Sequence, residues 1–506
     1  MINIGSKREC FFDNFLIDET KTTAEKRLHK PVRRNVLIEL DKPWEINEGS
    51  MNEATFFNVI YAEGKYRMHY VCNHPHGVKY VCYAESDDAQ NWVRPDLGIV
   101  EFNGSKNNNI IFDTQMFIDQ FDFKSFDNMS VFYDENPACP SDEKYKMTCW
   151  WGGHAALILL MGADCIHFTK SRFITDDGSF DSQNRMFWSK EHNKYFCYFR
   201  HEHEPGEGNV LTDRSYQDKD ANALYDPEKF LMRTPTGNDI YAFLRDVRVS
   251  ESEDSINWSK MQLINTTGKD YQLYNNCVFP YPRAPHLFVG LPLRYVERKA
   301  WTKNYDELCG REDRRARMNT CARFGLAVSD GLFMVSRDGY NFTKYDEAII
   351  PPPAENPEAF VYGDGTMTPA LIEIPSDIPG ADNEYMIYVR ESYRTKVGYN
   401  KLVKYTIRLD GFVSVHAGSD EAEAVTKEFT YDGSELYANI ATSARGYCYF
   451  TLKCGDEEYT SCEIFGNSTD KHIRFEDDDA VKKLSGKIVT LTMKLYDCDV
   501  YSVQFK

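Results

Sequence analysis

The sequence lacks the long apolar runs that export or membrane insertion requires. Its first residues, "MINIGSKRECFFDNFLIDE", contain no apolar stretch long enough for a signal peptide. No segment reaches the run of about 18 apolar residues that a membrane span needs. We therefore expect a cytoplasmic protein that does not enter a membrane.

Paired cysteines are also missing. The chain has 14 cysteines, but none of them form a Cys-x-x-Cys pair, so the spacing of a zinc finger is absent. A disulfide scaffold is unusual in a large chain without an export signal. We expect reduced and mostly buried thiols.

Basic charge is scarce. Lysine and arginine together number 59 against 78 acidic residues, which gives a formal net charge of −19. Nucleic acids and anionic membranes are bound through basic surfaces, so neither is expected as a partner. Aromatic residues, in contrast, make up 14% of the chain, which is typical of β-strands and of surfaces that bind ligands through rings.

A short turn motif recurs along the chain. It reads "SDDAQNW" at 86–92, "GADCIHF" at 162–168, "SEDSINW" at 252–258 and "SRDGYNF" at 336–342. The short aspartate side chain can cap backbone N–H groups of a tight turn, and the ring that follows can pack against a neighbouring sheet. We interpret the motif as a structural corner rather than a binding site.

Apolar and aromatic strands lie upstream of these corners, and a fifth unit follows near "NEYMIYVR" at 383–390. Units of this kind bury their sheet faces when they pack radially around an axis. The sequence predicts an all-β protein, with a five-bladed β-propeller over residues 1–415 and an N-terminal segment packed on it. The alternating pattern of residues 416–506 predicts a small β-sandwich.

In a propeller, the starts of the innermost strands and the ends of the second strands meet at one mouth of the central funnel. The side chains expected there are amides, guanidinium groups, indoles and carboxylates, which suit a polyhydroxylated ligand. The expected catalytic residues are Asp181, Glu391, Asp127 and Glu53. The expected substrate-binding residues are Asn184, Gln183, Arg200, Trp150, Trp151, Asn275, Asn276, Arg294, Asp364 and Arg390.

Cleavage of a glycosidic bond needs one carboxylic acid that protonates the leaving oxygen and one carboxylate that attacks the sugar or activates water. We assign Glu391 as the general acid and Asp181 as the nucleophile or base, because they lie on blades that are not neighbours and can flank a sugar ring. Asp127 and Asp364 would then orient hydroxyl groups, and Glu53 and Glu358 are the next candidates.

The corner motifs resemble those of the five-bladed propeller glycosidases of glycoside hydrolase families 32 and 43. The stretches "FDSQNRMFW", "RDVRVSESEDSINW" and "PEAFVYGD" resemble more closely uncharacterised bacterial proteins of this type, which end in a small β-sandwich. It implies a five-bladed fold and a glycosidase activity. Asp127 matches the acid that family 43 places in its second blade, whereas Asp181 stands where that family has a glutamate. The blade-1 stretch "SMNEATFF" lacks the aspartate of family 32.

Three functions stay open at this point. The leading one is a glycoside hydrolase that acts on an oligosaccharide. A glycoside phosphorylase would need a cationic phosphate pocket, for which Arg200, His201, His203, Arg294, Arg390 and Arg394 are available. The third is a non-catalytic carbohydrate-binding protein. No cofactor or metal is predicted, although hard oxygen ligands for an axial metal ion are abundant, and the oligomeric state is left open.

Overall fold

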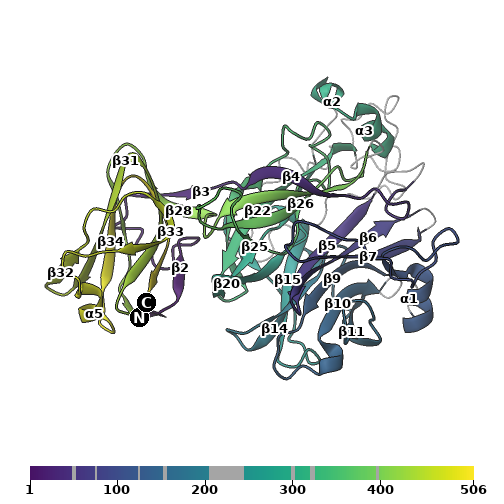
Figure 1. Ribbon diagram of the computed structural model, residues 1–506, viewed down its shortest axis with the longest axis horizontal. Coiled ribbons are helices and arrows are strands. Elements are labelled where there is room, and N and C mark those ends of the chain that lie inside the picture. The colour runs from purple at the N-terminus through teal and green to yellow at the C-terminus, as the bar shows by residue number, and fades with distance from the viewer. Residues whose placement is uncertain are drawn as a thin grey trace.

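The chain folds into two groups of β-strands. The computed structural model describes residues 1–47, 53–74, 77–122, 126–151, 156–203, 244–297, 303–318, 325–394 and 398–506. Figure 1 shows a larger group of sheets and a smaller group that holds both chain ends. The longest stretch outside these ranges is residues 204–243.

The larger group begins with three antiparallel four-stranded sheets. The first contains β5 (Ala54–Ala62), β6 (Lys65–Asn73), β7 (Lys79–Ser86) and β8 (Ile110–Asp113). The second contains β9 (Phe126–Tyr133), β10 (Tyr145–Trp151), β11 (Ala156–Gly162) and β12 (Lys170–Thr175). The third contains β13 (Arg185–Ser189), β14 (Lys194–His203), β15 (Leu244–Ser252) and β16 (Gln262–Leu263).

Two further sheets complete this group. One has seven strands: β17 (Asn265–Thr266), β18 (Gln272–Tyr274), β19 (Val278–Tyr281), β20 (Ala284–Gly290), β21 (Leu293–Glu297), β22 (Ala327–Ser336) and β23 (Asn341–Ile350). The other has five: β24 (Thr366–Met367), β25 (Ile372–Ile374), β26 (Glu384–Glu391), β27 (Lys401–Arg408) and β4 (Val32–Glu39). In the last sheet, the N-terminal strand β4 pairs with β27. Together the sheets have a β-propeller arrangement.

Apolar clusters fill the spaces between neighbouring sheets. One cluster joins Val71 and Val81 of the first sheet to Val131 and Met147 of the second. The centre is polar instead, because Gln183 donates from Nε2 to Asn58 Oδ1 (3.1 Å) and Arg185 donates from Nη1 to Ser130 Oγ (2.8 Å). These four buried side chains form an axial plug across the middle of the propeller.

The recurrent turns are structural corners, as expected. Asp88 Oδ1 accepts the backbone N–H groups of Gln90 and Asn91, both at 2.8 Å. Asp254 and Asp338 accept the equivalent backbone bonds in their own turns, and Asp164 accepts two backbone bonds as well. One chain therefore repeats the turn because several of its sheets need the same tight connection.

The smaller group consists mainly of an eight-stranded sheet. Its strands are β2 (Arg8–Cys10), β3 (Glu25–Leu28), β28 (Val413–Ala417), β29 (Ala422–Val425), β31 (Leu436–Cys454), β32 (Glu457–Thr460), β33 (Asn467–Ile473) and β34 (Thr490–Phe505). Two more strands, β1 (Ile2–Gly5) and β30 (Phe429–Tyr431), form a parallel pair beside it.

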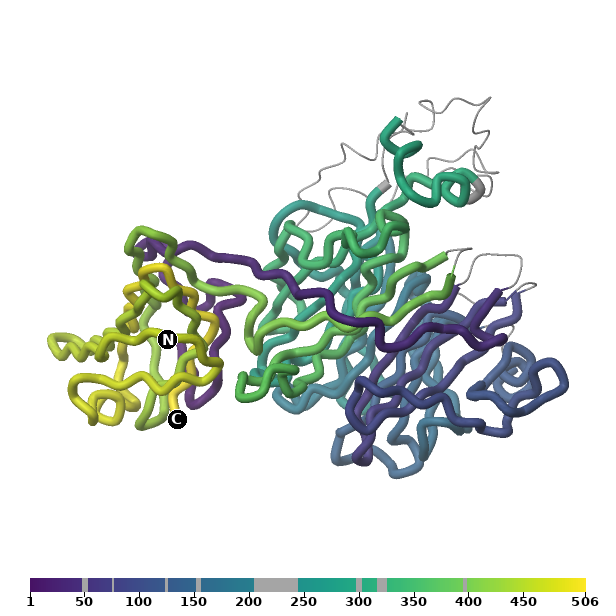
Figure 2. The backbone as a smooth tube through the Cα atoms, turned by 45° about the horizontal axis from the view of Figure 1, so that its top comes forward, coloured from purple at the N-terminus to yellow at the C-terminus, as the bar shows by residue number. Residues whose placement is uncertain are grey.

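The N-terminal segment does not simply pack on the propeller, which corrects the expected boundary. β1 pairs with β30, β2 with β34 and β3 with β28, so residues before β4 complete the C-terminal sheets. Figure 2 shows this segment leaving the smaller group and crossing to the larger one. These N-terminal strands form backbone hydrogen bonds with edges of the C-terminal strands that would otherwise be unpaired.

Helices are few and short in the described residues. They are α1 (Thr114–Phe121), the 3-10 turn at Ser141–Glu143, α2 (Lys303–Glu307), α3 (Arg311–Met318) and α5 (Ala480–Leu484). In this part of the chain, no helix has the length and apolar character needed to cross a membrane.

Candidate active site

A pocket opens where the first strands of the propeller sheets begin. Its volume is about 90 Å³. We call it the funnel pocket, and its lining residues are Glu53, Thr55, Phe56, Asn73, Asp127, Asn128, Asp181, Tyr274, Asn275, Tyr362, Arg390, Tyr393 and Arg394. Five of the residues expected from the sequence are among them: Glu53, Asp127, Asp181, Asn275 and Arg390.

Irregular backbone at the strand starts shapes this pocket. Phe56, Asn128 and Asn275 all have positive φ angles, of 53°, 55° and 52°. The pairing of β5 with β6 and of β9 with β10 shifts register near the first two of these positions. Non-glycine residues in this conformation cost about 1–3 kcal/mol each, and such strain concentrates at functional sites.

Glu53 is held as a carboxylate. Its Oε1 accepts hydrogen bonds from the Tyr393 hydroxyl (2.5 Å) and from Arg394 Nε (2.7 Å). Burial raises the pKa of Glu53, but the guanidinium of Arg394 and the hydroxyl of Tyr393 outweigh it, so the pKa lies below its ordinary value. Glu53 is therefore ionised at neutral pH.

The pKa of Asp127 is shifted in the opposite direction, above its ordinary value. Its Oδ2 pairs with Lys79 Nζ, and its Oδ1 accepts the backbone N–H of Asn128 at 2.8 Å. Burial raises the pKa of Asp127, and this effect exceeds the lowering by Lys79. The negative charge of Asp181 raises it further. The two acids thus have pKa values displaced in opposite directions.

Asp181 lies at the open side of the pocket. Its side chain is 61% exposed, and its Oδ2 lies 3.6 Å from Arg200 Nη1. Arg200 itself is buried and also pairs with Glu202. Arg200 therefore contacts a residue of the pocket lining, Asp181, but does not line the pocket itself.

Asn128 supplies a polar group that has no partner within the described parts of the chain. Its side chain is only 1% exposed, yet its Nδ2 makes no hydrogen bond there. Asn73 also lines the pocket, and its buried Oδ1 likewise has no hydrogen-bond partner among the described residues. Buried polar atoms are normally satisfied, so both atoms indicate a place for a ligand that offers hydrogen-bonding groups.

Arg390 lines the funnel pocket but is occupied by the fold. It donates to Thr55 Oγ1 (2.5 Å), to the Gly363 carbonyl (2.8 Å) and to Thr366 Oγ1 (3.0 Å), and it lies over the ring of Tyr393. It therefore joins the first and last sheets of the propeller.

Glu391, expected as the general acid, does not line the pocket. Both of its oxygens accept hydrogen bonds from Arg33 (2.9 Å each), and Oε1 also accepts one from the Tyr405 hydroxyl (3.0 Å). Successive side chains of a strand point to opposite faces, so Arg390 faces the funnel and Glu391 faces away from it. Within the last sheet, it links β26 to Arg33 of β4 and to Tyr405 of β27.

Asp364 also lies outside the pocket lining. It is buried and accepts the backbone N–H groups of Tyr393 (2.7 Å) and Ser392 (3.3 Å) and the side-chain amide of Asn356 (2.9 Å). Burial raises its pKa to about 7. It positions the turn that carries Tyr393, rather than a sugar hydroxyl.

The remaining expected binding residues lie outside the funnel pocket and contact other parts of the fold. Gln183 belongs to the axial plug, Asn184 bonds to the Phe180 carbonyl, and Asn276 bonds to the carbonyls of Gln183 and Tyr198. Arg294 forms a paired contact with Asp330. Trp150 and Trp151 pack beside apolar clusters between the sheets. None of these six residues appears in the lining of the funnel pocket.

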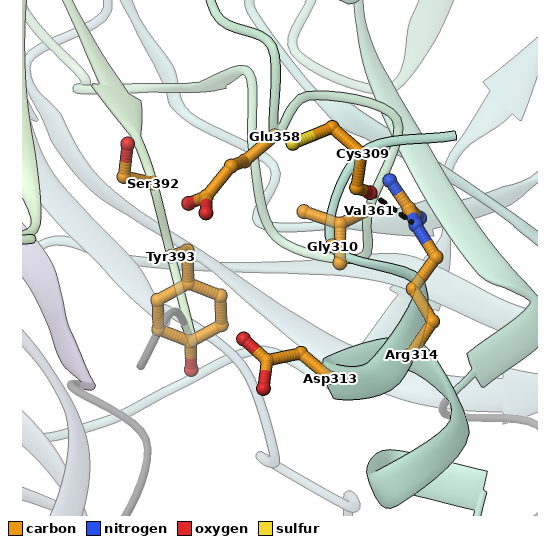
Figure 3. Close-up of a pocket in the computed structure, with 8 residues that line it drawn as sticks. All are labelled: Cys309, Gly310, Asp313, Arg314, Glu358, Val361, Ser392 and Tyr393. Atoms are coloured by element: carbon orange, nitrogen blue, oxygen red, sulfur yellow. Dashed lines mark hydrogen bonds between the residues drawn. The ribbon is translucent and has the colours of Figure 1, made fainter. Parts of the chain in front are cut away.

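Several residues of the site were not expected from the sequence. Tyr274, Tyr362 and Tyr393 form a chain of ring contacts, with centroids 5.7 Å and 6.4 Å apart. Lys79 is the first residue of β7 and lies beside the end of β6, so its position in the strand pattern could have predicted that it reaches the site. A smaller cavity of about 20 Å³ adjoins the site through Tyr393. Figure 3 shows its acidic groups, Asp313 and Glu358, on two sides of the Tyr393 ring.

Comparisons with known proteins identify no family for the chain. No protein-family model matches it, and no curated protein matches it. Solved structures similar to it include a thermostable family-43 glycoside hydrolase (11% identity, 73% of this chain, 96% of that chain, TM-score 0.42). Another is an N-acetylgalactosamine deacetylase from F. plautii (13% identity, 74% of this chain, 94% of that chain, TM-score 0.42).

A third similar structure is that of a family-43 arabinoxylan arabinofuranohydrolase from Bacillus subtilis (10% identity, 90% of this chain, 96% of that chain, TM-score 0.35). Several of the similar structures are thus named glycoside hydrolases. At these TM-scores, the function has to be argued from the site itself.

Proposed function

We propose that this protein is a glycoside hydrolase that cleaves an oligosaccharide in the funnel pocket. The observation that carries the proposal is the pair Glu53 and Asp127. Both carboxyl groups line one pocket, and their pKa values are displaced in opposite directions. Acid–base cleavage of a glycosidic bond requires one protonated and one ionised carboxyl group.

In this proposal, Asp127 is the general acid that protonates the leaving oxygen. Glu53 is the ionised group that attacks the sugar or activates water. The hydrogen bonds from Tyr393 and from Arg394 Nε both fall on its Oε1, and these contacts hold the carboxylate in the pocket. Asp181, exposed at the mouth, orients sugar hydroxyls, and the amide of Asn128 donates to one of them.

Hydrolysis is favoured over phosphorolysis because the arginine and histidine side chains that could bind phosphate already have partners in the fold. Arg390 is bound to acceptors of the fold, and Arg394 is paired with Glu53. Arg294 and His203 lie elsewhere, paired with Asp330 and with Asp246 and Asp270. A phosphate would need guanidinium groups that are not already engaged by carboxylates.

We also infer that each propeller sheet is one blade, which gives five blades. Support comes from the order of contacts, because β5 lies against β9, β9 against β13 and β13 against β19. The pairing of β4 with β27 would close the circle. The C-terminal sheets together with the N-terminal strands would form the β-sandwich, with the predicted boundary near residue 415.

The test is turnover of aryl glycosides and of oligosaccharides by matched variants. Glu53→Gln and Asp127→Asn should each lower kcat by at least about 100-fold, because each removes one half of the acid–base pair. An aryl glycoside with an activated leaving group should partly rescue Asp127→Asn but not Glu53→Gln. Glu391→Gln is the control and should keep its turnover. Near-normal rates in both site variants would refute the proposal.

A further inference from the structure

A second and larger cavity lies at the other end of the propeller axis. Its volume is about 510 Å³, which is within the range of small-molecule sites. We call it the rear cavity. Strands β5 and β9 begin at the funnel pocket and end here, with Tyr61 and Tyr133 in its lining. At about 3.3 Å per residue, Thr55 and Tyr61 are roughly 20 Å apart along β5, with the axial plug between the two sites.

The floor of the rear cavity is apolar. It includes Phe132, Phe279, Pro280, Pro369 and Leu371, which come from three of the sheets and the connections beside them. Such a surface gains free energy when a ligand with an apolar body displaces water from it. It offers little hydrogen bonding to the many hydroxyl groups of a sugar.

Tyrosine rings form the walls. Tyr61 and Tyr66 have centroids 4.8 Å apart and planes inclined at 52°, so they make a V-shaped corner. Tyr61 is 60% exposed at the cavity, and Tyr133 lines it from β9. The faces of such rings carry partial negative charge and attract cations.

The charged groups in the lining are also negative. They are Glu135 and Glu373, and the lining contains no lysine, arginine or histidine. Glu135 pairs with Lys190 at 3.0 Å, but both side chains are more than half exposed. Exposed pairs of this kind contribute only about 0–1 kcal/mol, so a ligand can compete for the carboxylate.

We propose that the rear cavity binds an organic cation, such as a quaternary or protonated amine with apolar substituents. The ring corner and the carboxylates would receive the positive centre, and the apolar floor would cover the substituents. This site is separate from the funnel pocket, so the proposal does not depend on the function proposed above.

The test uses choline and 3,3-dimethylbutan-1-ol, which has the same shape without the charge. Isothermal titration calorimetry on the full chain should show choline binding, with the neutral compound at least about fivefold weaker because the cation–π attraction is lost. Tyr61→Ala should weaken choline binding at least about fivefold, since it removes one wall. Glu373→Gln should weaken it less and reduce its dependence on salt.

Phe465→Ala is the matched control, because that ring is 63% exposed and belongs to the C-terminal part of the chain. It should leave choline binding unchanged. Circular dichroism would verify that each variant is folded. The proposal is wrong if choline does not bind, if the neutral compound binds equally well, or if Tyr61→Ala binds choline normally.

Discussion

At the scale of single residues, small differences in environment separate the roles of similar side chains. Glu53 and Glu391 both contact an arginine, but Glu53 lines the funnel pocket, whereas Glu391 is buried within the last sheet beside Arg33 of β4. Asp127 and Asp364 are both acids with raised pKa values, and only Asp127 reaches the pocket. Residue type alone therefore did not identify the site.

The pH dependence of kcat/KM should follow the two acids of the pocket. Activity should fall toward low pH as Glu53 becomes protonated, and toward high pH as Asp127 ionises. The pKa of Glu53 is lowered and that of Asp127 is raised, so the fall at low pH should move to lower pH, and the fall at high pH to higher pH, than for unperturbed carboxyl groups. In Asp127→Asn, measured with an activated aryl glycoside, the fall at high pH should disappear. A fall that persists there would assign it to another group.

Asp364 should make the folded state less stable as the pH rises. Its pKa is about 7 in the folded protein, because of burial, against about 3.9 in an unfolded chain. Between these values the folded state keeps a proton that the unfolded state has lost, so the free energy of unfolding decreases from about pH 4 to about pH 7 and then levels off. Urea unfolding across this range should show a flatter dependence in Asp364→Asn. An identical slope in both proteins would contradict this assignment.

At the scale of elements, the repeated corner connects strands in the same way in several sheets. In three of the turns, the residue after the aspartate has a positive φ: Ala89 (62°), Ser255 (60°) and Gly339 (80°). The aspartate makes this backbone favourable by accepting two N–H groups, and in each case the following asparagine donates to its second oxygen. The local sequence was sufficient to predict the capping role of the aspartate, because its hydrogen bonds in each turn all lie within seven residues of the chain.

Asp254→Ala should therefore lower the free energy of unfolding by about 1–2 kcal/mol, the usual effect of losing a side-chain cap. Chemical denaturation measures the change directly. The neighbouring Glu253→Ala is the control, because Glu253 is exposed and should change stability little. Turnover should be normal in both variants. Equal stability of the two variants would show that the capping bonds contribute nothing.

At the scale of the whole molecule, one buried aspartate links the two groups of sheets. Asp410 accepts hydrogen bonds from Tyr281 (2.9 Å) and Arg283 (2.9 Å) of the propeller and from Ser502 (2.7 Å) of β34. Arg8, on β2, also contacts it. Phe12 packs nearby between the rings of Tyr281 and Phe412. The N-terminal segment is thus part of the junction.

Asp410→Ala should destabilise this junction by about 3 kcal/mol, the lower end of the usual effect of breaking a buried ion pair, because Arg8 keeps its pair with Asp470 and Arg283 is only partly buried. Differential scanning calorimetry should show a lower Tm, with the two groups of sheets unfolding in more clearly separated steps. Asp420→Ala, at an exposed position, serves as the control. A thermogram of Asp410→Ala that matches the wild type would mean that the junction does not depend on this network.

Local patterns along the chain were enough to predict the strands, the turns and part of the pocket lining. Alternating apolar residues predicted the strands and the all-β class, and the aspartate corners predicted the turns. Strand positions also predicted that Glu53, Asp127, Asp181, Asn275 and Arg390 converge, because the starts of the inner strands and the ends of the second strands reach the same mouth.

Only the tertiary structure decided the features that depend on which face a residue takes and on which distant segment it meets. Arg390 and Glu391 are neighbours in the chain, but a strand sends them to opposite faces, and Arg33 from the N-terminus neutralises Glu391. The pairing of β2 with β34 joins residues nearly 500 positions apart, which no local pattern encodes. The environment of Glu53 and Asp127 likewise depends on burial and on Arg394 and Lys79, whose approach to the two carboxyl groups is fixed only when the sheets pack.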